Sequence, residues 1–391
     1  MSLASVSIGY IPLVDAAPLI VAQEMGFASE EGLSLDLRRA PSWSSVRDML
    51  AFGQVDAAHM LSPVPVATAL GLGGAGAKFS AISVLSMNGN VIGVSSELAA
   101  RLRGVGHDFG FSDAFKAGRA LIEAKTERLR IGVPFPFSMH AELLYYWLSA
   151  LGLPAPQSVD IRTVPPPLMA AAIEAGEIDA FCVGEPWGSQ AVDNGVGELL
   201  LPCSAIWSAA PEKVLAVRSD WVEHESSLTG RLIRSLWRAG RWLGNPDSRT
   251  LASELLSRPE YLNLPSEILD HALTGNLVIS PAGAQRHVEG FVEFFHGAAT
   301  FPWRSQAEWI GAQLAARTGL DRDAARKASR AVFRSDLYRQ ALASTSADLP
   351  GASSKLEGAL EVPTPVSSPS GRLILGRNQF FDGRIFEPLK D

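Results

Sequence analysis

The sequence predicts an α/β protein of two similar lobes, each built on a parallel-type sheet flanked by helices. Short hydrophobic runs alternate with longer helical patterns, which is typical of βαβ units around a parallel sheet. This alternation occurs twice at a constant offset of 123 residues, the separation of Gly53 and Gly176. In addition, 391 residues are more than one simple core needs, which favours two or three domains.

The repeat is clearest in two stretches that share Gly, a β-branched residue, Asp-Ala and Pro: GQVDAAHMLSP at 53–63 and GEIDAFCVGEP at 176–186. Upstream, VSIGYIP at 6–12 matches LRIGVPF at 129–135, and the strands LSLDLRRA and SVDIRTV match within one residue. The helical segments DAAPLIVAQEMGF and SMHAELLYYWLSA also coincide. Each copy therefore predicts the order strand, loop, helix, strand, loop, helix, strand.

Cap and turn residues predict where the second helix of each copy begins and ends. In the first copy, either Ser42 or Ser44 is placed to cap the helix and Gly53 to end it. In the second copy, the prolines at 165–167 favour a first helical turn and Gly176 ends the helix. The third strands that follow bring His59 and Glu185 near a cleft between the lobes, without marking either as a ligand contact.

The rest of the chain is expected to extend the first lobe. We assign residues 1–88 and 215–391 to lobe I with a helical C-terminal extension, and residues 89–214 to lobe II. Residues 205–345 have a mostly helical pattern, whereas residues 346–372 are rich in Ser, Pro and Gly and predict an extended connector. The tail NQFFDGRIFEP is aromatic enough to pack back onto a lobe.

Bulk composition excludes several classes of function. A net charge of −7 and a pI near 5.6 disfavour direct contact with nucleic acid. No apolar run is long enough to span a membrane. Cys182 and Cys203 lie in apolar contexts and are expected to be buried free thiols. The start MSLASVSIGYIPLV lacks the basic region of a secretory signal, which predicts a cytoplasmic protein unless a signal segment precedes it.

Motifs of catalysis and of cofactor binding are missing from the sequence. No CxxC or HExxH occurs and the seven histidines are scattered, so we expect no metal site. The chain also lacks a P-loop, a dinucleotide fingerprint after a strand, and a GxSxG elbow. Carboxylates are plentiful, but no pair is set apart as a general acid and base. The sequence therefore predicts no catalytic residue and no cofactor.

Four polar side chains remain at predicted strand-to-helix corners and strand ends. They are Trp43 in PSWSS, Asn90 in MNGNVIG, His140 in PFSMHAEL and Lys213 in APEKVLAVRS. Each has a plain structural alternative: respectively packing at a lobe edge, an Asn-Gly turn, a cap or surface position, and a solvated strand end. Together they would supply an indole N–H, an amide, an imidazole and one positive charge, a donor set for a small oxyanion in a cleft.

Ordered motifs from about residue 6 to residue 388 resemble the NrtA/CmpA family of nitrate- and bicarbonate-binding proteins of ABC transporters. The motifs include GYIPLVDAAPLIVAQEMGF, APSWSSVRD, MNGNVIG, DAFCVGEPW, APEKVLAVRSDW and FFDGRIFEP. The resemblance implies a type II periplasmic-binding-protein-like clamshell that closes on one planar anion, without catalysis. Within the family, VPFPFSMH and the missing signal segment look most like the NasS branch of cytoplasmic nitrate/nitrite sensors.

The resemblance also implies that the four polar side chains contact the anion. Trp43 matches the Trp of the SW corner, His140 the His of the second-lobe corner, and Lys213 the Lys of PEK. Asn90 stands where nitrate-binding relatives commonly have Gln, one methylene longer, which bears on the preference between nitrate and nitrite. His140 argues against bicarbonate, because the bicarbonate branch tends to lack it.

In the sensor branch, the resemblance implies a partner, an RNA-binding antiterminator (NasT-like) that the sensor holds inactive until the anion binds. Three alternatives stay open. The first is the binding component of a nitrate/nitrite or bicarbonate ABC transporter, with the permease as its partner. The second is an enzyme of thiamine-pyrimidine synthesis, whose related fold carries a Cys-rich motif that is missing here. The third is a sensor for another small anion, such as a sulfonate.

Overall fold

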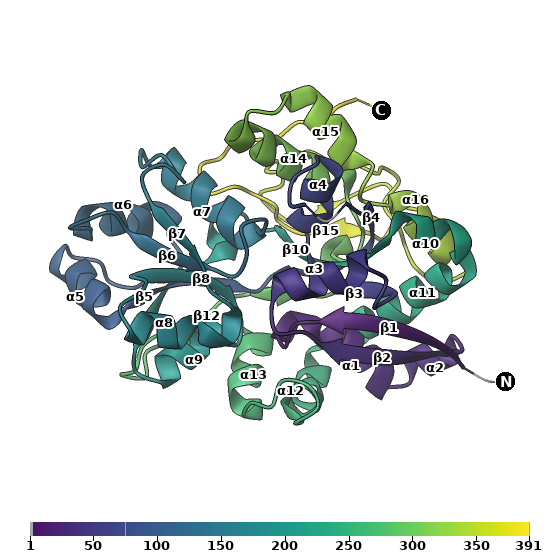
Figure 1. The fold of residues 1–391 in the computed structure, drawn as a ribbon, viewed down its shortest axis with the longest axis horizontal. Coiled ribbons are helices and arrows are strands. Elements are labelled where there is room, and N and C mark those ends of the chain that lie inside the picture. Colours follow the sequence, from purple (N-terminus) through teal and green to yellow (C-terminus); the bar gives the residue numbers. More distant parts are fainter. Residues whose placement is uncertain (1–2, 75, 391) are drawn as a thin grey trace.

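The computed structural model describes residues 3–74 and 76–390, which fold into two α/β lobes lying side by side (Figure 1). Lobe I holds a six-stranded sheet in the order β13-β4-β10-β3-β1-β2, and lobe II a five-stranded sheet in the order β7-β6-β8-β5-β9. The pairs β11-β12 and β14-β15 form separate two-stranded sheets. The strands are β1 (Ala4–Tyr10), β2 (Leu33–Arg39), β3 (Ala57–Leu61), β4 (Phe79–Asn88), β5 (Asn90–Ser95), β6 (Arg130–Val133), β7 (Asp160–Thr163), β8 (Ala180–Gly184), β9 (Gly197–Pro202), β10 (Pro211–Arg218), β11 (Asn276–Val278), β12 (Gln285–His287), β13 (Val292–Glu293), β14 (Thr364–Pro365) and β15 (Ile374–Leu375).

Helices flank both sheets, and residues 219–342 are mostly helical, in line with the helical pattern predicted for residues 205–345 (Figure 1). The helices before β5 are η1 (Val14–Ala16), α1 (Ala17–Glu24), α2 (Phe27–Glu30), α3 (Trp43–Ala51) and α4 (Pro63–Ala69). Those between β5 and β10 are α5 (Ser96–Gly104), α6 (Ala114–Ala124), α7 (Met139–Ala150), η2 (Pro166–Leu168), α8 (Met169–Glu174), α9 (Trp187–Asp193) and η3 (Cys203–Ala205). Those after β10 are α10 (Ser219–His224), α11 (Ser226–Leu243), η4 (Pro246–Ser248), α12 (Arg249–Ser257), α13 (Ser266–Thr274), η5 (His296–Ala298), α14 (Arg304–Thr318), α15 (Arg322–Arg330) and α16 (Ser335–Leu342). Within the described residues, none of these helices combines the length and apolarity that crossing a membrane requires.

The two main sheets have equivalent topologies. Three parallel strands, β2-β1-β3 in lobe I and β7-β6-β8 in lobe II, are joined on one side by an antiparallel strand, β10 or β5. The chain enters lobe II directly, because β4 ends at Asn88 and β5 begins at Asn90, with Gly89 at φ +89° between them. The sheets are therefore mixed, and the predicted parallel type holds only for the three-strand groups.

The return from lobe II to lobe I lies earlier than the sequence suggests. β9 ends at Pro202 in the second sheet, and β10 begins at Pro211 in the first sheet, between β3 and β4. A boundary between residues 214 and 215 would cut this strand in the middle. Because β10 hydrogen-bonds to β3 and β4 along both edges, the strand and its Lys213 belong to lobe I.

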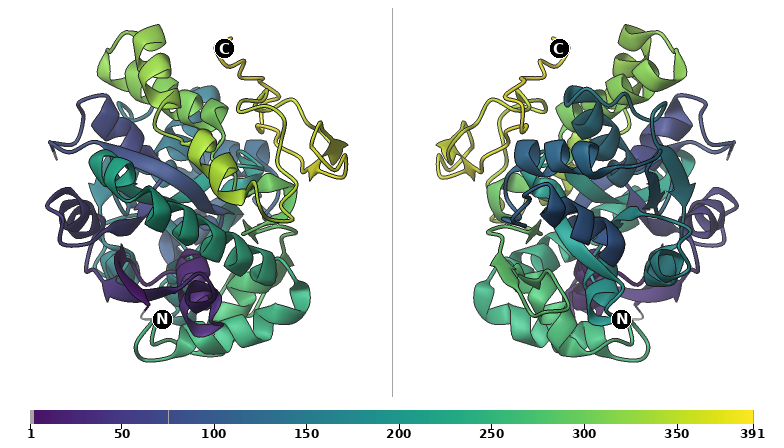
Figure 2. Two further views of the ribbon diagram at one scale, coloured as in Figure 1. Left: turned by 90° about the vertical axis from the view of Figure 1, so that its right-hand side faces the viewer. Right: turned by 90° about the vertical axis from the view of Figure 1, so that its left-hand side faces the viewer.

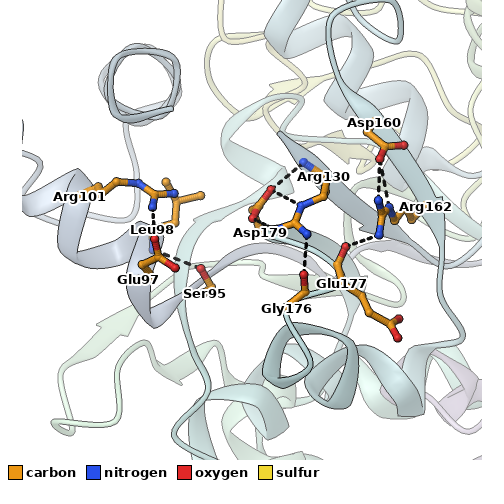
Figure 3. Close-up of polar contacts among 10 residues, drawn as sticks. All are labelled: Ser95, Glu97, Leu98, Arg101, Arg130, Asp160, Arg162, Gly176, Glu177 and Asp179. Atoms are coloured by element: carbon orange, nitrogen blue, oxygen red, sulfur yellow. Dashed lines mark hydrogen bonds and ion pairs between the residues drawn. The ribbon is translucent and has the colours of Figure 1, made fainter. Parts of the chain in front are cut away.

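The duplication extends to individual contacts. The backbone N–H of Ser7 in β1 donates to Asp56 Oδ2 at 2.8 Å, and the backbone N–H of Arg130 in β6 donates to Asp179 Oδ2 at 2.9 Å. Both aspartates precede the third strand of their copy, and the Arg130 guanidinium also pairs with Asp179 at 2.5 Å (Figure 3). Asp56 and Asp179 are themselves 123 residues apart, so the offset found in the sequence is the offset between equivalent contacts.

A second pair of contacts repeats with an offset of 124 residues, one more than the first pair. Arg162 in β7 donates to Asp160 of its own strand at 3.1 Å and to the carbonyl oxygen of Glu177 at 2.6 Å (Figure 3). Arg38 in β2 likewise donates to Asp36 of its own strand at 2.8 Å. Each arginine lies on the parallel strand at the edge of its sheet, which is β2 in lobe I and β7 in lobe II.

The predicted helix ends are confirmed. Ser42 caps α3, because its hydroxyl accepts a hydrogen bond from the Ser45 N–H at 3.2 Å, which decides between Ser42 and Ser44. Gly53 follows α3 and Gly176 follows α8, with φ of +70° and +67°. Glycine adopts this left-handed conformation without the steric cost that a side chain imposes, so both helices end where the sequence predicts.

The C-terminal tail packs back onto the body of the protein, as predicted. The Phe380 ring stacks on Trp207 with ring centroids 4.8 Å apart. Tyr146 of α7 donates a hydrogen bond to Asp382 at 2.7 Å, so the tail also contacts lobe II. The preceding residues 346–372 contain β14 as their regular element and form the extended connector at the edge of the molecule (Figure 2).

Cys182 in β8 and Cys203 in η3 are free and fully buried, as predicted. Their Sγ atoms lie 3.4 Å apart. Burial raises the pKa of the Cys182 thiol, so it is protonated at neutral pH and packs as a small core residue.

Candidate ligand site between the lobes

The four polar side chains singled out in the sequence converge where the lobes meet. Trp43 is the first residue of α3 and Lys213 lies in β10 of lobe I, whereas Asn90 begins β5 and His140 lies in the first turn of α7 of lobe II. Each of the four is at most 1% exposed. The alternatives of a solvated strand end for Lys213 and a surface position for His140 are therefore wrong. Contact with a ligand stays a prediction for all four.

Helix caps fix two of these side chains. Ser42 caps α3, which makes Trp43 the first helical residue. Ser138 caps α7 by accepting a hydrogen bond from the Ala141 N–H at 3.2 Å, which places His140 at the second helical position. Because a cap satisfies an N–H that would otherwise lack a partner, both helices begin at a defined residue and hold these side chains in place.

Lys213 is held by two carboxylates that the sequence analysis missed. Its Nζ lies 2.7 Å from Asp15 Oδ2 and 2.9 Å from Glu212 Oε1. The same Nζ lies 5.5 Å from the centroid of the Trp43 ring, within cation–π range. The positive charge of Lys213 is therefore shared, since the lysine also neutralises carboxylates of the protein itself.

The sequence pattern of the strand could not assign Glu212 to the same site as Lys213. Consecutive residues of a regular strand point to opposite faces of the sheet, so the two side chains were expected to lie apart. The pairing of β10 with β4 shifts register on both sides of Lys213, and this irregularity lets residues 212 and 213 join one cluster. Asp15 lies in η1 just before α1, where an acidic residue is also typical of any helix start. The PEK motif was the one signal in the sequence that contained Glu212.

Two histidines flank the carboxylates. His59 Nε2 lies 3.0 Å from Asp15 Oδ1, and His140 Nδ1 lies 3.3 Å from Glu212 Oε1. Burial lowers the pKa of His59, although Asp15 opposes the change. Burial and then the charge of Lys213 lower the pKa of His140 well below its ordinary value. Both imidazoles are therefore neutral at pH 7, each with one donor and one acceptor nitrogen.

The carboxylates respond differently to the same lysine. Burial alone would raise the pKa of Asp15, but Lys213 and His59 outweigh it and lower this pKa to about 2. Burial raises the pKa of Glu212, and Lys213 offsets only part of that rise. Burial would lower the pKa of Lys213, but the two carboxylates raise it. In the described part of the chain, no group of three or more His, Cys, Asp and Glu is placed to hold a metal ion.

Several buried polar atoms around Lys213 make no hydrogen bond with other described residues. They include Trp43 Nε1, both amide atoms of Asn90, both ring nitrogens of His140 and Glu212 Oε2, although Asn90 is close enough to Glu212 to lower its pKa. A buried polar group without a partner costs about 1–3 kcal/mol, and native proteins rarely leave several together. Their gathering indicates that a polar ligand belongs at this place, and most of these atoms are potential donors.

Hydrogen bonds to backbone carbonyl oxygens join the two lobes beside the cluster. The Val14 N–H donates to the carbonyl oxygen of Glu185 at 2.9 Å, and the Trp187 indole N–H donates to the carbonyl oxygen of Pro12 at 3.0 Å. Gly184, at the end of β8, lies so close to lobe I that a Cβ there would be 3.1 Å from Leu13 Cδ2. The segments before α1 and after β8 are therefore in direct contact beside the cluster.

A second contact joins the lobes at their outer side. Arg317 of α14 pairs with Glu142 of α7 and lies over the Phe137 ring, 5.8 Å from its centroid. The Glu142 side chain is 2% exposed. Burial raises the pKa of Glu142 to about 7, although Arg317 lowers it. This ion pair connects the C-terminal extension of lobe I to the helix that carries His140.

Comparison with known proteins identifies the family. The sequence profile of the NMT1-like family matches residues 2–257, which include all the residues of the cluster. The chain belongs to the NMT1-like family. Its relatives include the nitrate/nitrite binding protein NrtA of Nostoc sp. PCC 7120, which is 28% identical over 98% of this chain and 83% of NrtA. The resemblance to the NrtA/CmpA family is thereby confirmed.

Another relative of this NMT1-like chain is the nitrate import ATP-binding protein NrtC of Synechocystis sp. PCC 6803, 32% identical over 80% of the chain. The match covers 46% of NrtC, so the chain corresponds to about half of that relative. The crystal structure of the periplasmic nitrate-binding protein NrtA from Synechocystis PCC 6803 has a TM-score of 0.84 at 24% identity and covers 99% of this chain and 96% of NrtA. The predicted two-lobed periplasmic-binding-protein-like fold is therefore confirmed.

Proposed function

We propose that this NMT1-like protein binds nitrate or nitrite between its two lobes and releases the anion chemically unchanged. One observation carries the proposal: polar groups from both lobes gather, without partners, around a buried lysine. An oxyanion fits such a set, because N–H donors in a dry site replace the hydration that the anion loses. The likeness to NrtA, named as a nitrate/nitrite binding protein, supports these two anions among the oxyanions.

Each of the four side chains has its own part in this proposal. Trp43 donates its indole N–H from lobe I, and His140 donates an imidazole N–H from lobe II. Asn90 donates an amide N–H. Lys213 supplies positive charge as a member of the cluster with Asp15. An anion that contacts both lobes binds the closed arrangement better than an open one, so its binding shifts the protein toward closure.

We further propose that the bound anion serves uptake rather than sensing. The sequence motifs favour a cytoplasmic sensor that controls a NasT-like antiterminator, with transport as the alternative. The relatives support transport, since NrtC is named for nitrate import and the NrtA of known structure is named periplasmic. In this proposal the partner is the permease of an ABC transporter, and the protein works in the periplasm.

Binding partners distinguish uptake from sensing. The purified protein is mixed with a candidate permease in lipid vesicles, and separately with a candidate antiterminator, with and without saturating nitrate. Uptake predicts nitrate-dependent association with the permease and transport of nitrate into the vesicles. Nitrate-dependent release of the antiterminator, without any effect on the permease, would restore the sensing role.

Trp43→Phe is expected to weaken nitrate binding by about tenfold to a hundredfold, because one hydrogen bond to a charged group contributes about 1.5–3 kcal/mol. The change removes the indole N–H and keeps an aromatic ring over Lys213. Calorimetric titration with nitrate and nitrite measures the effect. Trp207→Phe is the matched control, since Trp207 is equally buried but stacks on Phe380 in the tail cluster. Equal losses in both variants would point to general destabilisation instead of a lost contact.

Gly184→Ala is expected to weaken nitrate binding roughly tenfold, since overpacking a tight site costs about 1–3 kcal/mol. The added Cβ would lie 3.1 Å from Leu13 Cδ2 and 3.3 Å from Asn90 Oδ1, so the lobes could not close fully. Calorimetric titration with nitrate measures the loss. Gly104→Ala in α5 is the control, because a Cβ there meets no neighbour within 4 Å. Unchanged affinity in Gly184→Ala would mean that binding does not need this close approach.

A further inference from the structure

The cluster around Lys213 holds one more negative than positive charge. Asp15 and Glu212 both contact the Lys213 ammonium, at 2.7 and 2.9 Å. Among the described residues, no Arg and no second Lys lies within ion-pair distance of either carboxylate. A monovalent anion that entered this cluster unaccompanied would therefore meet a site that is already negative.

The other titratable groups that face the cluster supply no positive charge. His59 of β3 lies 3.0 Å from Asp15, and His140 of α7 lies 3.3 Å from Glu212. Burial lowers the pKa of both imidazoles, so they are neutral at pH 7. Cys182 of β8 is close enough to feel the charge of Glu212, and burial raises the pKa of its thiol. With Asp15 and Glu212 both ionised, the cluster therefore carries a net charge of −1.

One atom of the cluster has room for a proton. Glu212 is 0% exposed, and its Oε1 contacts Lys213, whereas its Oε2 has no hydrogen-bond partner among the described residues. Asp15 Oδ1 also has no hydrogen-bond partner among the described residues, but it lies 3.0 Å from His59 Nε2, and Asp15 Oδ2 lies 2.7 Å from Lys213 Nζ, so each Asp15 oxygen has a nitrogen within ion-pair distance. A carboxyl group protonated at Glu212 Oε2 would keep its contact with Lys213 and gain an O–H donor.

We propose, resting on the function proposed above, that the protein takes up the anion together with one proton, which Glu212 carries at Oε2. Protonation turns this carboxylate, which repels an anion, into a neutral donor beside the N–H groups of Trp43, Asn90 and His140. The net charge of the cluster with the anion bound is then −1, as it is without the anion, instead of −2. Glu212 is thus a specificity-determining residue that makes a negatively charged site receptive to a monoanion.

The same charge count defines the class of ligand. One proton on Glu212 compensates one negative charge, which suits nitrate and nitrite. A dianion such as sulfate would leave a second charge uncompensated in a buried site, and this is costly. We therefore expect no detectable heat of sulfate binding at concentrations that saturate the protein with nitrate.

Proton uptake is measured by calorimetric titration of the full chain with sodium nitrate in buffers that differ in ionisation enthalpy. We expect the affinity to fall as pH rises and to approach a tenfold loss per pH unit over the range in which Glu212 is ionised in the free protein, with close to one proton taken up per nitrate there. Nitrate binding with no proton uptake and a constant affinity across this range overturns the inference but leaves the proposed function intact. Absence of nitrate binding at every pH overturns the proposed function itself.

Glu212→Gln tests the residue, because the amide keeps the shape and the donor of the protonated acid. This variant should bind nitrate without proton uptake, with affinity independent of pH and at the highest pH no weaker than in the wild type. Glu185→Gln is the matched control, since burial raises the pKa of this carboxyl to about 7 outside the cluster. It should retain proton uptake. Uptake that survives in Glu212→Gln but disappears in Glu185→Gln overturns the assignment to Glu212. If Glu212→Gln fails to fold, the buffer series on the wild type still decides whether a proton is taken up.

Discussion

Replacing Lys213 with Met is expected to destabilise the folded protein by about 3–5 kcal/mol and to remove measurable nitrate binding. The ammonium lies 2.7 Å from Asp15 and 2.9 Å from Glu212, and all three side chains are buried. Without Lys213, two buried carboxylates would share one site with no opposite charge. Urea unfolding at about pH 7.5 measures the loss of stability, and calorimetric titration with nitrate measures the loss of binding.

A double variant separates the structural effect of Lys213 from its effect on binding. Lys213→Met combined with Asp15→Asn removes one of the two negative charges, and Glu212 can then take up a proton. This variant is expected to regain most of the lost stability, because the remaining groups form a neutral cluster. Nitrate binding should stay absent, since no positive charge remains near the anion. A double variant that bound nitrate like the wild type would remove Lys213 from the site.

The repeat explains why much of the fold could be predicted from the sequence. The matched stretches contain Asp56 and Asp179, which tie the first and third strands of each lobe, so equal spacing reflects equal contacts. The direction of β10 and β5 could not be predicted in this way. An apolar strand has the same composition beside a parallel or an antiparallel neighbour, and the path of the chain between the lobes sets its direction.

The site was only partly predictable for a related reason. The matched motifs placed Trp43, Asn90, His140 and Lys213 in one cleft, and the structure brings them together. Glu212 was missed because only the register shift in β10 brings it beside its neighbour in sequence. The local pattern of a strand carries no sign of such a shift.

Replacing Arg317 with Met is expected to lower stability by about 3 kcal/mol at pH 8 but much less at pH 5, and to weaken nitrate binding. Arg317 of α14 pairs with Glu142 of α7 across the two lobes, 175 residues apart in sequence. At pH 8 the variant would leave a buried carboxylate without a partner, whereas near pH 5 Glu142 is protonated and needs none. Urea unfolding at both pH values and calorimetric titration with nitrate measure the effects.

The pH dependence of this ion pair has a definite sign. The pKa of Glu142 is about 7 in the folded protein and 4.5 as the ordinary value, so the folded state holds the proton more tightly. The stability from this group is fully present below the ordinary pKa and is lost as pH rises through about 7. Removing Arg317 raises the folded pKa further and extends the loss to higher pH. Arg317→Met combined with Glu142→Gln should show neither the loss of stability as pH rises through about 7 nor its extension to higher pH. If Arg317→Met alone lost equal stability at both pH values, the packing of Arg317 on Phe137, and not its charge, would hold the lobes together.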